Sequence, residues 1–147
     1  MNDKEFLRQF EAAIIPASQW HHREHIRVAY LYLTRFQQSI AIERIISGIK
    51  ALNTAQKVPD SIDRGYHDTI TQAWIRLVQC TLDEFGPAES ADAFMDKQTQ
   101  LLSKRALLFF YSRERIMSAE AKANFIEPDL APLPRSAIRD ATKPPGR

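Results

Sequence analysis

The sequence is poor in glycine, with 4 among 147 residues, and it has a single cysteine, Cys80. The glycine-rich motifs that bind nucleotide phosphates are absent, so nucleotide-dependent chemistry is not expected. One cysteine excludes an internal disulfide framework and a zinc site built from cysteines. A lone thiol is typical of proteins in a reducing compartment, and we therefore expect a cytoplasmic protein.

Long apolar runs are also absent. No stretch approaches the ~18 consecutive apolar residues of a membrane-spanning helix, so we expect no membrane partner. The first ten residues show no basic segment followed by an apolar run, which is the pattern of a secretory signal peptide. With 44% hydrophobic residues, the chain is too apolar for a disordered protein and long enough for one folded domain.

Neither sign of charge is in large excess, because 20 basic residues stand against 18 acidic ones. Residues 135–147 contain four basic residues and one acidic residue, so the rest of the chain has a net charge of −1. A nucleic-acid-binding domain needs a dense basic face to displace counterions from phosphates. We therefore expect a small-molecule partner and no specific binding to nucleic acid. No feature locates a subunit interface, and the default expectation is the commonest oligomer, a homodimer.

Apolar residues recur at helical spacing, for example at positions 26, 29, 30 and 33 and again at positions 42, 45, 46 and 49. We predict helices at about residues 3–13, 22–36, 39–54, 67–85 and 91–103, and short helical segments at 104–112 and 118–125. Ser39, Ser90 and Ser118 are the expected N-caps. The fold class is all-α: a single-domain bundle of four to five main helices over residues 1–133, with short extra helices. An extended, proline-containing, mobile C-terminal tail is expected at residues 134–147.

All four histidines lie in two short segments, and each segment opens a long predicted helix. The first segment, WHHREHIR, contains His21, His22 and His25, and the second, GYHDT, contains His67. His22 and His25 are three residues apart, so they share one side of a helix with Cβ atoms about 5–6 Å apart. His22 and His67 also continue the apolar stripes of their helices. We therefore expect a pocket between the starts of the second and fourth helices.

The chain resembles a family of small bacterial all-helical proteins whose activity is uncharacterised. The resemblance covers about residues 5–133 and includes the Tyr-Ser-x-Glu sequence at 111–114 and the Phe-x-x-Pro-Asp-Leu sequence at 125–130. The family's aromatic-x-His-x-x-His-aliphatic-Arg and Tyr-His-Glu/Asp-Thr motifs fall here on Trp20, His22, His25, Arg27, Tyr66, His67, Asp68 and Thr69. The resemblance implies that these residues belong together, and it implies no substrate. His21 stands where the pattern implies a threonine-like N-cap.

Three imidazoles at one pocket are typical of a metal centre, because neutral imidazole is the commonest protein ligand of metals. We predict that His22, His25 and His67 bind a divalent ion such as Zn, Fe, Ni or Mn. The protein would then be a metal-dependent enzyme, a hydrolase or a lyase, acting on a small polar or anionic metabolite. Asp68 or Glu24 would act as the catalytic base.

The remaining predicted site residues would contact the substrate. Arg27 would bind its negative charge. The other candidates are aromatic or hydroxyl-bearing side chains near the same motifs, namely Tyr66, Thr69, Trp74 and Tyr111.

Two other interpretations stay open at this point. Helix N-termini favour an anion over a cation, so the pocket could belong to a metal-free, non-catalytic protein that binds an anionic small molecule at two converging helix N-termini. The histidines could also be purely structural, since a polar side chain at a helix start often caps it. On that interpretation Glu24 completes a capping box and Asp68 only suits the helix dipole.

Overall fold

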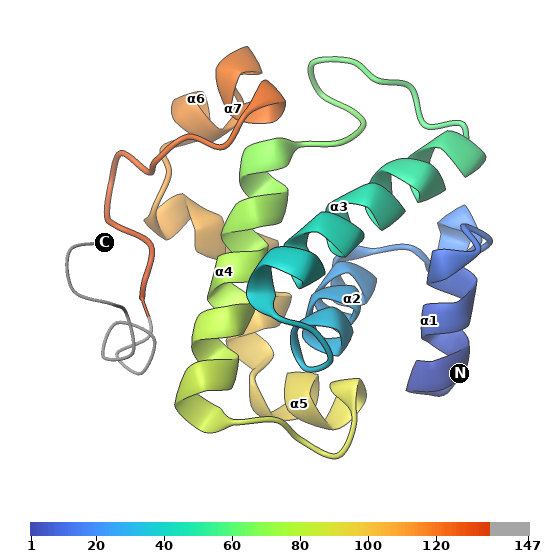
Figure 1. The fold of residues 1–147 in the computed structure, drawn as a ribbon. Coiled ribbons are helices and arrows are strands. Elements are labelled where there is room, and N and C mark those ends of the chain that lie inside the picture. Colours follow the sequence, from blue (N-terminus) through green and yellow to red (C-terminus); the bar gives the residue numbers. More distant parts are fainter. Residues whose placement is uncertain (136–147) are drawn as a thin grey trace.

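The computed structural model describes residues 1–135, and every regular element there is helical, so the all-α prediction is confirmed (Figure 1). The α-helices and the 3-10 helices (η) are, in chain order, α1 (Asp3–Glu11), η1 (Ala17–Gln19), α2 (His22–Leu33), α3 (Gln38–Ala55), α4 (Asp68–Phe85), α5 (Ala91–Lys97), η2 (Thr99–Leu102), η3 (Lys104–Phe109), α6 (Arg113–Ile116) and α7 (Ala119–Ala123). None of the helices described combines the length and apolar character that crossing a bilayer requires. The predicted tail at residues 134–147 lies outside the described residues, apart from its first two.

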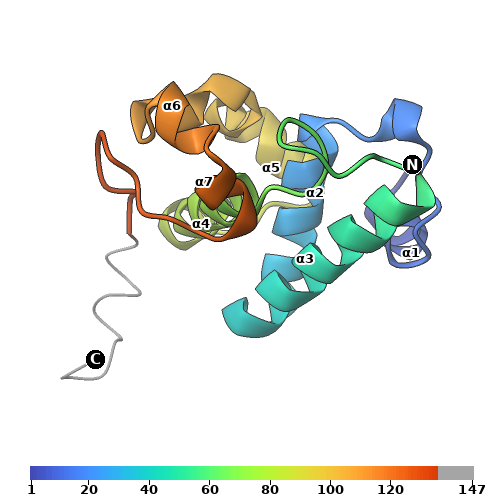
Figure 2. The same ribbon diagram turned by 90° about the horizontal axis from the view of Figure 1, so that it is seen from above.

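Helix α2 is the centre of the structure. It lies between α4 and α1 in both views, and it also contacts α3, α5 and η2 (Figures 1 and 2). Every residue from Val28 to Leu33 is buried, which is the pattern of a helix enclosed on all sides. The first turn of α2 lies against η2, where His22 Nε2 bonds to the Leu101 carbonyl.

Helix α3 buries two of the four isoleucines that mark its predicted face, Ile45 and Ile49. The buried positions are Ala41, Ile45, Ile49 and Leu52, whereas positions 42 and 46 are only half-buried. The small residue Gly48 lies directly against the Phe10 ring of α1, so close that a side chain there would overlap the ring. Gly48 thus lets α1 and α3 pack closely at this position. The N-cap prediction at position 39 is also wrong, because α3 begins one residue earlier and its N-cap is residue 37.

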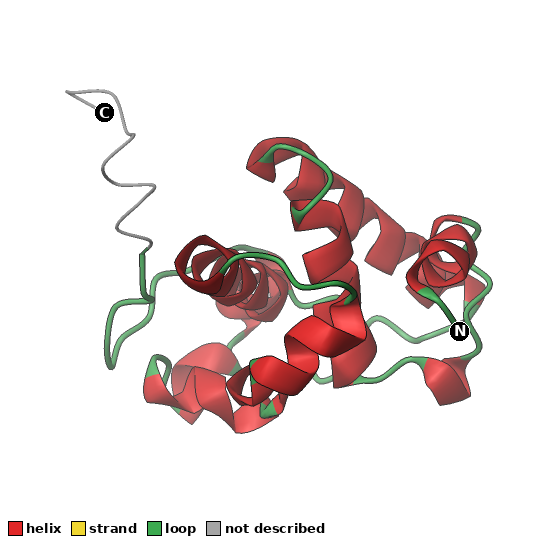
Figure 3. Ribbon diagram, turned by 90° about the horizontal axis from the view of Figure 1, so that it is seen from below, coloured by secondary structure: helices red, strands yellow, loops and turns green. Residues whose placement is uncertain are grey.

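The helix predicted over residues 91–103 ends at Lys97. Gln98 leaves the helical conformation, and the 3-10 helices η2 and η3 follow, separated by loops from α6 and α7. Figure 3 shows the described residues as helices joined by loops. This path buries Leu101 and Leu107 in the core, and it turns the Leu101 carbonyl toward α2. The short helix α6 was not predicted; the Ser112 side chain caps it by accepting a hydrogen bond from the Arg115 N–H at 3.2 Å.

Replacing Gly48 by alanine is expected to lower the free energy of unfolding by about 2 kcal/mol, because the new methyl group overlaps the Phe10 ring in a filled core. Urea unfolding measures the change. Ser47→Ala, on the exposed neighbouring position of α3, is the matched control and should shift the value by less than about 0.5 kcal/mol. Adding Phe10→Leu to Gly48→Ala should restore part of the loss. Equal effects of the two alanine substitutions would show that α1 and α3 are not in such close contact.

Candidate functional site

A cavity of about 860 Å³ lies between the first turns of α2 and α4 and the segment that contains η3 and α6. Its size is suited to a small ligand. Its polar and aromatic lining residues are Trp20, His21, His22, His25, Asn53, Tyr66, His67, Thr71, Trp74, Lys104, Arg105 and Arg113. Most of the others are aliphatic, from α3, α4, η3 and α6. The cavity is therefore an apolar space with histidines and cations on its wall.

His22 lies at the first position of α2, and its Nε2 is 2.8 Å from the carbonyl oxygen of Leu101. A carbonyl only accepts, so Nε2 carries the hydrogen and donates. Burial lowers the pKa of His22, and Lys104 lowers it further, while the Leu101 bond and Glu24 act in the opposite direction. The ring is therefore neutral at pH 7, and no group in the described part of the chain donates to its Nδ1.

His25 lies one turn further along α2. Its Nδ1 donates to the carbonyl oxygen of His21 at 2.9 Å, and its ring packs on Trp20 with 4.2 Å between ring centroids. Burial lowers the pKa of His25 to about 4, with smaller contributions in the same direction from His22 and Lys104. The ring is neutral at pH 7, so Nε2 has the lone pair, and no group within residues 1–135 bonds to it.

His67 is the N-cap of α4, and both of its ring nitrogens are engaged. Nδ1 accepts a hydrogen bond from the Ile70 N–H at 3.1 Å, and Nε2 donates to the Ile116 carbonyl oxygen at 2.7 Å. Burial lowers the pKa of His67, which favours this neutral form. His67 thus joins the start of α4 to the end of α6, and it has no lone pair free for a ligand.

The structure brings His22, His25 and His67 to one cavity, but it does not present them as three metal ligands. His67 would first have to give up a hydrogen bond. Within residues 1–135, no group of three or more His, Cys, Asp and Glu side chains is arranged so that it could hold a metal ion. The predicted three-histidine set does not fit a metal in this arrangement. Metal binding itself stays a prediction.

The two carboxylates predicted as bases lie outside the cavity. Asp68 accepts hydrogen bonds from the Tyr66 hydroxyl at 2.7 Å and from the Gln72 side-chain amide at 3.0 and 3.1 Å. Glu24 accepts from the His21 backbone N–H at 3.0 Å, as a residue that caps α2 does. Neither lines the cavity, although Glu24 is close enough to influence the pKa of His22.

Arg27 also lies away from the cavity. Its guanidinium donates to the Asp3 carboxylate at 2.9 Å and to the Met1 carbonyl at 2.7 Å, and it stacks 4.3 Å above the Phe6 ring. These contacts hold α1 against α2. The structure therefore places Arg27 in the packing of the N-terminal helix and gives no support to a role in substrate binding.

Thr69 and Tyr111 form buried hydrogen bonds to the chain that follows α7. The Thr69 hydroxyl donates to the Asn124 carbonyl at 2.9 Å and accepts from the Ile126 N–H at 3.1 Å. The Tyr111 hydroxyl donates to the Ile126 carbonyl at 2.6 Å. Of the five predicted substrate contacts, the structure brings only Tyr66 and Trp74 to the cavity.

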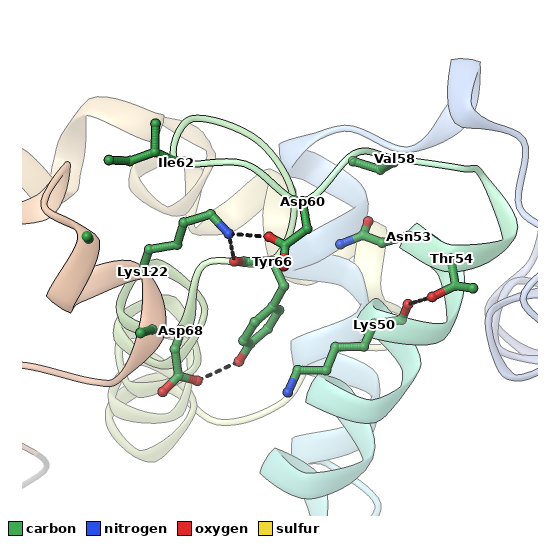
Figure 4. Close-up of a pocket in the computed structure, with 12 residues that line it drawn as sticks. Lys50, Asn53, Thr54, Val58, Asp60, Ile62, Tyr66, Asp68 and Lys122 are labelled. Carbon is green, nitrogen blue, oxygen red and sulfur yellow. Dashed lines mark hydrogen bonds and ion pairs between the residues drawn. The ribbon is translucent and has the colours of Figure 1, made fainter.

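A second cavity of about 610 Å³ shares Tyr66 with the first, and its lining residues are drawn in Figure 4. Its charges balance, because Lys50 and Lys122 stand against two aspartates. The Lys122 ammonium donates to Asp60 at 2.7 Å and to the Tyr66 carbonyl at 2.9 Å, and the Tyr66 hydroxyl points to the carboxylate of α4 (Figure 4). Three residues, Asn53, Gly65 and Tyr66, line both cavities. The end of the loop before α4 and one residue of α3 therefore contribute to the walls of both cavities.

Three cations of the first cavity were missed from the sequence. Lys104, Arg105 and Arg113 are exposed, and within residues 1–135 none of them has an ion pair or a side-chain hydrogen bond. No aspartate or glutamate of the described chain lines this cavity. The adjacent Lys104 and Arg105, directly before the apolar run 106–111, were the available signal.

No protein-family model matches the chain, and no curated protein and no solved structure is significantly similar to it. The resemblance to the bacterial helical family accordingly stays a prediction based on motifs.

His67→Ala is expected to lower the free energy of unfolding by about 2 kcal/mol. About half comes from the lost N-cap of α4 and half from leaving the Ile116 carbonyl without its donor. His67→Asn keeps an acceptor for the helix N–H and should recover about half of the loss. Urea unfolding of the three proteins checks this. An alanine variant as stable as the wild type would mean that His67 does not join the two helices.

The free energy of unfolding is expected to fall between pH 6.5 and 5, because the unfolded chain then binds a proton that folded His25 does not accept. A histidine pKa of about 4 in the folded state and 6.5 when unfolded gives stability that is complete above pH 6.5. That stability is lost as the pH falls toward 4, on the order of 3 kcal/mol in total. Urea unfolding at several pH values should show a weaker dependence for His25→Gln than for the control His21→Gln. Parallel curves for the two variants would contradict the assignment.

Proposed function

We propose that the cavity between α2 and α4 binds a small organic anion with an apolar or aromatic body, and that this binding needs no metal. The observation that carries the proposal is the charge of the wall: three unpaired cations and no carboxylate among the described lining residues. Such a wall attracts an anion and repels a divalent cation.

The cations lie where they can serve this role. Lys104 and Arg105 begin η3 and Arg113 begins α6, and all three are exposed at the edge of the cavity. A guanidinium binds a carboxylate or a phosphate through two parallel hydrogen bonds, and an ammonium adds a point charge. Lys104 also influences the pKa of His22 and His25, so it lies close to both imidazoles. The anionic group of the ligand would therefore bind near the start of η3.

The apolar part of the wall suits the body of such a ligand. Trp20 and Trp74 flank the histidines, and Ile45, Ile49 and Ile70 line the interior. Burial of an aromatic ring against these side chains stabilises the complex by roughly 25 cal/mol per Å² of apolar surface. A purely polar anion such as free phosphate would leave most of this wall without contacts. The cavity favours an aromatic or aliphatic acid.

A divalent-metal enzyme, a hydrolase or a lyase, is the second candidate. One observation favours it: His22 and His25 each keep one ring nitrogen without a hydrogen-bond partner in residues 1–135, and they are three residues apart on α2. The cations at the edge and the engaged nitrogens of His67 count against it. Elemental analysis of untagged protein separates the two candidates, because a metal enzyme should retain close to one ion per chain.

Calorimetric titration with indole-3-acetate and with its neutral amide tests the proposal. The acid is expected to bind at least tenfold more tightly than the amide, with or without EDTA. Lys104→Met and Arg113→Met should each weaken binding of the acid by about fivefold, the effect of roughly 1 kcal/mol per partly exposed charge. Lys4→Met, an exposed cation of α1 outside the cavity, is the matched control. Equal binding of acid and amide, or loss of binding in EDTA, would overturn the proposal.

A further inference from the structure

The two histidines of α2 present hydrogen-bond acceptors of fixed position. His22 donates from Nε2 to the Leu101 carbonyl, and His25 donates from Nδ1 to the His21 carbonyl. Because a carbonyl has no hydrogen to give, the hydrogen of each neutral ring is committed to these bonds. The other nitrogen of each ring, Nδ1 of His22 and Nε2 of His25, can then only accept.

Both acceptors are open to solvent. Within residues 1–135, Gln79 Oε1 is the only buried side-chain nitrogen or oxygen that lacks a hydrogen-bond partner. The two ring nitrogens also lack a partner in that part of the chain. Since neither is among its buried unpartnered atoms, each reaches solvent-accessible space. The 860 Å³ cavity is a space that both side chains line.

Each of the two imidazole rings packs against a tryptophan ring. The Trp20 ring lies 4.2 Å from His25 and the Trp74 ring 4.5 Å from His22, measured between centroids. The i, i+3 spacing places the two histidines on one side of α2. Together with the hydrogen bonds to the carbonyls, these contacts fix the positions of two acceptor nitrogens beside the tryptophan rings. Polar groups with fixed positions give a binding site its specificity.

We propose that the ligand of this cavity carries, besides its anionic group, an un-ionised N–H or O–H group that donates to Nδ1 of His22 or Nε2 of His25. The inference rests on the proposed function and names the ligand class more narrowly. The cations bind the anionic group, and the histidines select among acids, because an acid without a donor displaces water from the ring nitrogens and gives no hydrogen bond in return. A hydroxylated aromatic acid and an indole or amide-containing acid both satisfy this requirement.

Matched ligand pairs test the donor requirement. The full-length protein is titrated by calorimetry at pH 7.5 with 4-hydroxyphenylacetate and 4-methoxyphenylacetate, and with indole-3-acetate and 1-methylindole-3-acetate. In each pair the methyl group removes the donor and keeps the charge and the ring. The donor-bearing acid is expected to bind at least tenfold more tightly. Equal affinity within both pairs would overturn the donor requirement and leave the anion proposal standing. Absence of binding by all four acids would overturn the proposed function itself.

Substitution locates the acceptors. His22→Phe and His25→Phe keep a flat ring and remove the nitrogens, and at least one of them is expected to reduce the tenfold preference to less than threefold. His21→Gln is the matched control, because His21 lines the same cavity but bonds through Nε2 to the Ser18 carbonyl of η1. An unchanged preference in both phenylalanine variants would overturn the assignment of the acceptors.

A measurement on the unaltered protein covers the case in which those variants do not fold. In ¹H–¹⁵N spectra of the histidine rings, addition of 4-hydroxyphenylacetate should move the resonance of the unprotonated nitrogen of His22 or His25 upfield, as a nitrogen that accepts a new hydrogen bond does. The methoxy analogue should leave it in place. The ring of His67 serves as the internal reference, because both of its nitrogens already have partners. Identical responses to the two acids would contradict the inference.

Discussion

Hydrogen bonds from imidazole rings to backbone carbonyls connect the long helices α2 and α4 to residues 101–116. His22 reaches from α2 to Leu101, and His67 reaches from α4 to Ile116. The segment between those two carbonyls contains only short helices, which are not stable by themselves in water. Its path therefore depends on contacts with the long helices. Since the same bonds decide which ring nitrogens remain free, the packing of the chain and the chemistry of the cavity have a common origin.

The long helices were predictable from the sequence because periodic apolar residues mark them. Helix α4 was predicted to within one residue at its start and correctly at its end, where Gly86 and Pro87 stop it. The face of α3 was predicted only in part, since Ile45 and Ile49 are buried but Ile42 and Ile46 are only half-buried. Ala41 is buried and Gly48 lies against the Phe10 ring, and a hydrophobic pattern gives little weight to either small residue. Residues 98–116 were harder still, because 3-10 helices leave no period of 3.6 residues in the sequence.

The site was predictable to the extent that its residues share a local motif. The histidines at two helix starts were grouped correctly around one cavity, and Tyr66 and Trp74 came with them. The partners of charged side chains could not be predicted, because a spacing does not show what lies opposite after folding. Arg27 meets Asp3 from a different helix. The cations of η3 and α6 belong to the segment whose fold depends on tertiary contacts, so the sequence could not orient them.

The two tryptophans of the chain are both in the wall of this cavity, and each stands against one of the two histidines with an open ring nitrogen. Because there is no tryptophan elsewhere, the whole indole emission of the native protein originates beside this one space. A molecule that enters it changes the surroundings of both fluorophores at once. The protein therefore contains its own optical reporter of occupancy, and screening a chemical library requires neither a label nor an engineered probe.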